Sequence, residues 1–137
     1  MSPKNINFAS IMKQVITDKA PQAIGPYSQA IVTGGMVYAS GQIAINPETG
    51  DIVEGGIEAQ AHQVLKNVSN ILAAAGSSMN RVVKTTVFMA DMADFATVNN
   101  IYTTYFSEPY PARSAVAVKS LPKNVLIEIE VVAEIEK

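Results

Sequence analysis

The stretch VLIEIEVVAEIE, residues 125–136, alternates between two sets of side chains along its whole length. Every odd-numbered position is apolar, whereas the even-numbered positions include four glutamates, Glu128, Glu130, Glu134 and Glu136. Because successive side chains of a β-strand point to opposite faces, this pattern predicts a strand with one buried face and one charged face.

Two segments upstream of this strand have helical periodicity instead. Apolar residues recur at helical spacing over residues 57–75, and Gly76 follows as a stop signal. A second helix is expected between a capping residue, Asp91 or Asp94, and the helix-breaking Pro109. Its apolar stripe comprises Phe95, Val98, Tyr102, Tyr105 and Phe106.

Four further strands are expected, at Ser28–Thr33, Met36–Ser40, Val82–Ala90 and Arg113–Val118. The first two flank Gly34-Gly35, a pair that tolerates the positive φ angles of a two-residue hairpin. The resulting order is β-β-α-β-α-β-β. It predicts an α+β fold in which two helices pack on one face of a mixed sheet.

The strand Val82–Ala90 indicates that the protein is an oligomer. We place Val83, Val87 and Met89 on one of its faces and Val82 and Phe88 on the other. Two helices can cover only one face of a sheet, and an apolar face is costly to leave in water. We therefore expect another subunit to cover the second face.

Length and composition limit the function classes. The 137 residues form a single domain, residues 14–137, after a loose N-terminal extension, residues 1–13. The absence of cysteine excludes disulfides, thiolate metal sites and a cysteine nucleophile. A net charge of -2, without a stripe of Lys and Arg, argues against nucleic acid as a partner.

No membrane span or secretory signal is expected. Residues 20–47 carry no charge, but prolines and glycines interrupt them too often for a spanning helix. The first thirteen residues lack arginine and a long apolar core. We expect a cytoplasmic protein, with a short mitochondrial presequence as the weaker alternative.

Few residues are candidates for chemistry, and each has a plain structural alternative. Arg113, at a loop-to-strand boundary, either covers apolar surface or binds an anion such as a carboxylate. Glu128 either faces solvent or handles a water molecule in a cleft. The segment Ser40-Gly41-Gln42 is either a bulged strand end or a place where a ligand approaches the backbone. Tyr27 either packs or donates a hydrogen bond.

The single histidine, His62, is expected on the solvated side of the first helix, and no second His or Cys could complete a metal site around it. Neither Gly-rich nucleotide-binding pattern occurs in the chain. Local chemistry therefore indicates a small oligomeric α+β protein with a possible anion-binding arginine, and names no reaction.

Several motifs, taken together and in order, resemble the RidA (YjgF) family of reactive-intermediate deaminases. They include AIGPYSQA at 23–30, YASGQI at 38–43, VKTTV at 83–87, PARS at 111–114 and IEIE at 127–130. The resemblance covers nearly the whole chain. It implies a chorismate-mutase-like fold and a homotrimer with a central β-barrel and three clefts between subunits.

The resemblance also implies an activity. The expected reaction is hydrolysis of short-chain 2-imino acids, 2-iminobutanoate and 2-iminopropanoate, to 2-keto acids and ammonia, without a cofactor or metal. By this resemblance Arg113 grips the substrate carboxylate, Glu128 holds the hydrolytic water and Tyr27 lines the cleft. Ser40 and Gly41 face the ligand.

One position departs from the family pattern, since Ala115 stands where many members have cysteine. The alanine retains the backbone N–H that is expected to contact the ligand. Two other functions stay open: a non-catalytic binder or sensor of small carboxylates, and an RNA-directed translation inhibitor or ribonuclease.

Overall fold

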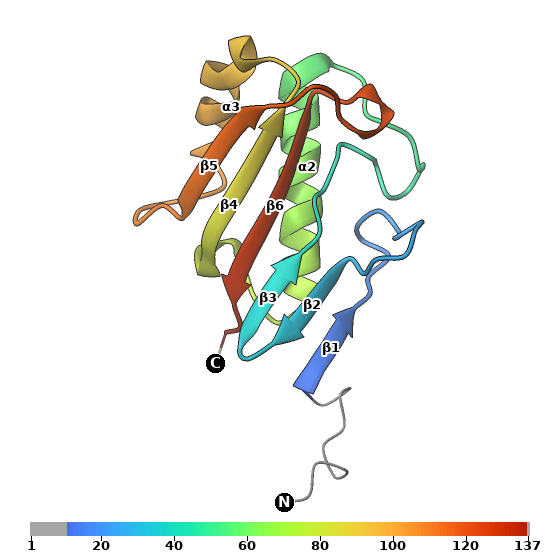
Figure 1. Ribbon diagram of the computed structural model, residues 1–137, viewed down its shortest axis with the longest axis vertical. Helices are drawn as coiled ribbons and strands as arrows, with labels where there is room; N and C mark the ends of the chain where they lie inside the picture. The colour runs from blue at the N-terminus through green and yellow to red at the C-terminus, as the bar shows by residue number, and fades with distance from the viewer. Residues whose placement is uncertain (1–10, 137) are drawn as a thin grey trace, which may run out of the picture.

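The computed structural model describes residues 11–136 and shows two helices packed on one face of a six-stranded mixed sheet (Figure 1). The strands lie in the order β1-β2-β3-β6-β4-β5, and only the β4–β5 pair is parallel. The strands are β1 Met12–Val15, β2 Ala30–Thr33, β3 Met36–Ala39, β4 Val82–Met89, β5 Ala112–Ala117 and β6 Ile127–Glu134. The helices are α2 Gly56–Ala74 and α3 Phe95–Tyr102, with single 3-10 turns at η2 Met79–Arg81, η3 Met92–Asp94 and η4 Pro122–Asn124. The predicted α+β class is confirmed.

The alternating stretch forms β6 at the centre of the sheet, between β3 and β4. Ile127, Ile129, Val131 and Ala133 are all buried against the helices, as their spacing predicts. The opposite face of β6 carries Glu128, which is half-buried, and Glu130, which is exposed. The strand therefore contributes one face to the core and presents two carboxylates on the other.

Helix α2 supplies the other half of the core. Its buried stripe faces β6 and β3 and comprises Ala61, Val64, Leu65, Val68, Ile71 and Leu72. The helix ends where the sequence predicts, because Gly76 adopts a φ of 83° and Ser77 N–H donates back to the carbonyl of Leu72 at 2.8 Å.

The hairpin between β2 and β3 is also confirmed. Gly34 and Gly35 have φ angles of 58° and 76°, the pair of positive values that a two-residue turn requires.

Strand β1 is an addition to the predicted order. Met12 and Lys13 belong to the segment expected to be loose, yet they pair with Thr33 and Val32 of β2. Three of the four β1 residues are exposed, so this edge strand lacks the alternation by which a sequence reveals a strand. The rest of the predicted extension, residues 1–10, lies outside the described residues.

The prediction for β4 is wrong in one respect. We expect Val83 to share a face with Val87 and Met89, but the register shifts between Val82 and Lys84. Val82 is therefore buried, while Val83 is 40% exposed. A bulge of this kind adds one residue to a strand and exchanges the faces on either side of it.

The second helix is shorter than predicted. It ends at Tyr102, seven positions before Pro109, and turns carry the buried Phe106. Asp91 caps η3, accepting a hydrogen bond from Ala93 N–H at 2.8 Å, whereas the Asp94 side chain makes no capping bond.

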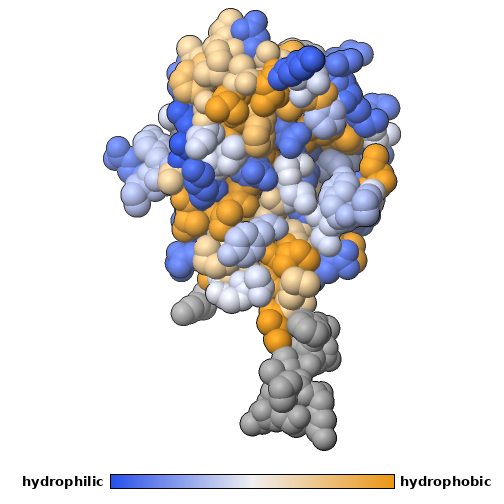
Figure 2. Space-filling view, viewed as in Figure 1, coloured by the Kyte–Doolittle hydropathy of each residue, from blue (hydrophilic) through white to orange (hydrophobic). Residues whose placement is uncertain are grey.

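The sheet face opposite the helices has no cover from the described part of the chain. Figure 2, drawn from the direction of Figure 1, shows hydrophobic patches set among hydrophilic residues on this side. Tyr38 and Val116 are among the exposed large hydrophobic residues, and Phe88 and Val132 are half-buried. Within residues 11–136, no helix is long and apolar enough to cross a membrane.

Candidate active site

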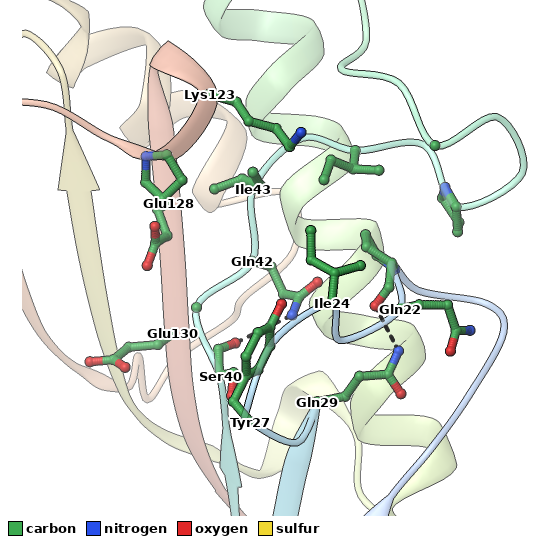
Figure 3. Close-up of a pocket in the computed structure, with 16 residues that line it drawn as sticks. Gln22, Ile24, Tyr27, Gln29, Ser40, Gln42, Ile43, Lys123, Glu128 and Glu130 are labelled. Atoms are coloured by element: carbon green, nitrogen blue, oxygen red, sulfur yellow. Dashed lines mark hydrogen bonds between the residues drawn. The ribbon is translucent and has the colours of Figure 1, made fainter.

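A pocket of about 720 Å³ opens where the loop before β2, the segment after β3, the turn η4 and strand β6 meet (Figure 3). Its lining includes Tyr27, Ser40, Gly41, Gln42, Lys123 and Glu128. The structure thus brings together four of the six residues expected at the site: Tyr27, Ser40, Gly41 and Glu128.

The backbone after β3 shapes this pocket through a bulge. Tyr38 pairs with Val132 and Gln42 pairs with Ile129, so four steps along one strand oppose three along the other. The extra residue lies between Tyr38 and Gln42, in the segment that contains Ser40 and Gly41. Gln42 N–H and Ile129 N–H exchange hydrogen bonds with each other's carbonyls at 2.9 and 3.1 Å, which closes the bulge.

Gly41 lies directly over the side chain of Glu128. A Cβ at position 41 would approach the carboxylate, with 2.8 Å to its Cδ and 3.1 Å to its Cγ. A Cβ contact as short as the one to Cδ is essentially never seen in proteins, so the Glu128 side chain occupies the space that a larger residue at position 41 would fill. The first alternative for Ser40-Gly41-Gln42, a bulged strand end, is therefore confirmed. The approach of a ligand to this backbone stays a prediction, and in the structure the side chain beside Gly41 is that of Glu128.

Glu128 is the titratable group with a perturbed environment in this pocket. Burial raises the pKa of Glu128 above the ordinary value of a glutamate, and the negative charge of Glu130 raises it further. Figure 3 shows both carboxylates on the same side of β6. A half-buried carboxylate of this kind can accept a proton from a bound water molecule and later return it.

Two short contacts hold the pocket's other wall. The Ser40 hydroxyl donates to the Ser28 carbonyl at 2.6 Å, and Ser40 N–H donates to the Gln29 carbonyl at 2.9 Å. The loop that carries Tyr27 is thereby tied to the end of β3. Tyr27 itself is half exposed, so its ring is not part of the core.

Gln29 is a structural residue of the site that the sequence analysis missed. Its side chain is 4% exposed and is hydrogen-bonded at both ends, accepting from Thr17 N–H at 2.8 Å and donating to the Pro21 carbonyl at 2.8 Å. A buried amide with matched partners anchors the loop 17–21 beneath the pocket. Nothing in local periodicity indicates this role, because the partners are eight and twelve residues away.

Arg113 lies elsewhere in the chain, on strand β5 and in a separate hollow of about 450 Å³. Its Nη1 donates to Oδ1 of Asn99 at 2.7 Å. Its guanidinium carbon is 4.9 Å from the ring centroid of Tyr102 and 5.3 Å from that of Phe95. The arginine therefore rests on two aromatic rings with its charge open to solvent.

The predicted site residues thus fall into two groups within one chain. Ala115, like Arg113, lies on β5 and is half-buried against the core. Neither residue lines the pocket that holds Glu128. A single site that used both groups would need β5 of one copy of the chain and the Glu128 pocket of another.

His62 lies outside the site, as expected. It is exposed on α2, and its Nδ1 is 2.8 Å from the Tyr105 hydroxyl. Among residues 11–136, no cluster of His, Asp and Glu is suited to holding a metal ion.

Comparison with known proteins identifies close relatives. The family model described as Endoribonuclease L-PSP matches residues 17–135. A protein of Mus musculus named 2-iminobutanoate/2-iminopropanoate deaminase is 52% identical over 127 residues, which is 92% of this chain and 94% of that protein.

Solved structures agree with this relationship. The crystal structure of a putative endoribonuclease from Thermotoga maritima has a TM-score of 0.88 and 54% identity, covering 91% of this chain and 98% of that one. The crystal structure of E. coli TdcF with bound serine has a TM-score of 0.85 and 46% identity, covering 90% of this chain and 99% of that one.

Proposed function

Because the chain belongs to the Endoribonuclease L-PSP family of RidA and YjgF proteins, we propose that it is an enzyme that hydrolyses short 2-imino acids to 2-keto acids and ammonia. The observation that carries this function is the half-buried Glu128 carboxylate, which lies under Gly41 in a pocket with room for a small acid. The resemblance seen in the sequence is confirmed.

The reaction needs little from the protein except orientation and a proton carrier. A protonated imine is already electrophilic at C2, so a water held by Glu128 can attack there while its proton passes to the carboxylate. The product is a carbinolamine. Glu128 returns the proton to the nitrogen, and the C–N bond breaks with its electron pair going to nitrogen. Ammonia leaves, the hydroxyl passes its proton to the Glu128 carboxylate to form the keto group, and that proton then goes to the released ammonia to give ammonium.

The substrate's carboxylate needs a cation, and Arg113 is the proposed partner. A guanidinium binds a carboxylate with two parallel hydrogen bonds, which fixes both position and orientation. E. coli TdcF was crystallised with serine, a molecule that carries the same α-carboxylate. Tyr27, Ser40, Gly41 and the backbone N–H of Ala115 are proposed to complete the binding site.

Since Arg113 and Glu128 line different hollows of one chain, we propose a homotrimer in which each site lies between two subunits. Support comes from the uncovered sheet face, where Tyr38 and Val116 are exposed. Burying such residues between subunits is favourable. Light scattering in solution tests the trimer directly.

The activity is tested by generating 2-iminobutanoate from threonine with a pyridoxal-phosphate dehydratase and following imine decay with and without the protein. We expect faster decay and matching release of 2-oxobutanoate. A decay rate that the protein leaves unchanged, at any concentration, contradicts the proposed function and favours a carboxylate sensor.

The shared site has its own test. Arg113→Ala and Glu128→Gln subunits are each expected to be inactive alone. Randomly mixed after unfolding and refolding in equal amounts, they should regain about a quarter of wild-type activity, because in a cyclic trimer some interfaces receive both intact residues. No recovery from correctly refolded mixtures contradicts a site built from two subunits.

RNA-directed activity, which the family description suggests, has less support. The Glu128 pocket contains two carboxylates, Glu128 and Glu130, and phosphate backbones are bound by clustered cations. The cytoplasmic location expected from the sequence stays a prediction, to be tested by imaging the tagged protein in its native cell.

A further inference from the structure

The hydrogen bond between Asn99 and Arg113 is suited to orienting the guanidinium rather than to stabilising the fold. Asn99 Oδ1 accepts a hydrogen bond from Arg113 Nη1 at 2.7 Å, and the arginine is exposed. Exposed polar pairs add little to folding stability, since water replaces them at small cost. A short contact at this place is better suited to holding the guanidinium in one orientation.

Three residues of α3 contact the side chain of Arg113. Phe95, Asn99 and Tyr102 are spaced by four and three positions, so they share one face of the helix. That face lies over the outer edge of the sheet, where β5 runs (Figure 1). The guanidinium carbon lies over both rings, 5.3 Å from the centroid of Phe95 and 4.9 Å from that of Tyr102, while Asn99 accepts a hydrogen bond from Nη1.

This arrangement is anchored in the core through Tyr102. Its hydroxyl is 2.8 Å from Oγ1 of Thr85, which is fully buried on β4. Thr85 is also the register partner of Arg113 across the β4–β5 pair. The strand that carries Arg113 and the ring beneath its guanidinium are thus fixed to the same buried residue.

We propose that Asn99 is a positioning residue for Arg113, and that it leaves the Nε–Nη2 edge of the guanidinium to receive the substrate carboxylate. Within residues 11–136, Asn99 supplies the hydrogen-bond acceptor found for this side chain, and it occupies Nη1. A carboxylate that approaches the remaining edge forms the two parallel bonds of a fork. The inference rests on the proposed function, because it assigns the substrate's orientation.

Two substitutions at position 99 separate positioning from stability. Asn99→Ala removes the acceptor, and we expect KM for 2-iminobutanoate and the Kd of 2-oxobutanoate to rise about tenfold with kcat little changed, as for lost binding shared by ground and transition states. Asn99→Asp adds a competing carboxylate beside the guanidinium, and we expect both constants to rise about a hundredfold.

The matched controls are Asn100→Ala and Asn100→Asp, one position along the same helix on an exposed residue. Asn100→Asp makes the same change in net charge, so a general electrostatic effect would weaken both aspartate variants equally. Thermal midpoints of all four variants should lie close to that of the wild type.

The outcomes are distinguishable from failure of the proposed function. If the wild type hydrolyses imines and Asn99→Asp binds 2-oxobutanoate as tightly as Asn100→Asp does, the positioning role is wrong. If the wild type does not hydrolyse imines, the 2-oxobutanoate titration still tests the pair. Equal loss at positions 99 and 100, or a loss confined to kcat, also overturns the proposal.

Discussion

The side chain of Glu128 fills the space that a side chain on Gly41 would need, because a Cβ on residue 41 would lie 2.8 Å from the Cδ of Glu128 and 3.1 Å from its Cγ. The bulge that places Gly41 there is closed by the pairing of Gln42 with Ile129, the residue next to Glu128 on β6. The position of the carboxylate is therefore coupled to the backbone of the segment after β3, almost ninety residues earlier in the chain.

Gly41→Ala should lower activity while leaving the fold intact. Gly41 is not among the residues with positive φ, so alanine fits the backbone, and the flexible end of Glu128 can swing aside. A displaced catalytic group typically reduces rate, here by about tenfold to a hundredfold. Steady-state kinetics and thermal unfolding check both halves of the prediction.

Gly25→Ala is the control for this variant. A Cβ at Gly25 would meet the Tyr27 ring at 3.4 Å, which is ordinary contact, and the residue also lacks a positive φ. Its activity should match the wild type. Full activity in Gly41→Ala would show that Glu128 needs no fixed position.

Glu130→Gln should shift the pH dependence of the reaction. The charge of Glu130 contributes to the raised pKa of Glu128, so a neutral side chain there lowers the pKa and increases the ionised fraction at any acidic pH. The acidic limb of the kcat/KM profile should move to lower pH. Glu134→Gln, at an exposed glutamate on the same strand, should leave the limb where it is.

The same carboxyl predicts a dependence of stability on pH. The pKa of Glu128 is higher in the folded state than in the unfolded state. The contribution of this carboxyl to folding stability is therefore complete below the unfolded pKa, about 4.3, and is lost as the pH rises through the folded pKa. Glu128→Gln should therefore unfold at a higher temperature than the wild type at neutral pH. The difference should shrink in acid, and a difference that grows in acid would contradict the assigned direction.

Arg113→Ala should reduce kcat/KM by about a hundredfold or more, because it removes the proposed carboxylate partner. Arg113→Lys keeps the positive charge but lacks the planar fork, so it should recover little of the loss. Both variants should fold, since the guanidinium is exposed. Wild-type kinetics in either variant would remove Arg113 from the site.

The buried pair of Thr85 and Tyr102 predicts a coupled loss of stability. Thr85→Val or Tyr102→Phe leaves one hydroxyl of the 2.8 Å contact without its partner, which should cost about 1–3 kcal/mol of unfolding free energy. The double variant should cost less than the sum of the two, because no hydroxyl is then left unpaired. Additive losses in urea unfolding would show that the contact contributes nothing.

Much of the fold follows from local patterns. The alternation in residues 127–134, the apolar stripe of residues 57–75 and the Gly34-Gly35 turn each predict an element that the structure contains. These features depend on neighbouring residues, whose spacing along the chain already states which side chains share a face. The family motifs likewise predict roles for Arg113 and Glu128, which the substitutions above test.

Only the tertiary structure decided how these residues meet. The exchange of Val82 and Val83 between faces and the addition of β1 depend on partners across the sheet. The hydrogen bonds of the Gln29 side chain depend on a loop eight to twelve residues away. The contact of Asn99 with Arg113 and the separation of Arg113 from Glu128 are of the same kind. Register and side-chain contacts between distant strands are set by packing of the whole core, which a one-dimensional pattern does not contain.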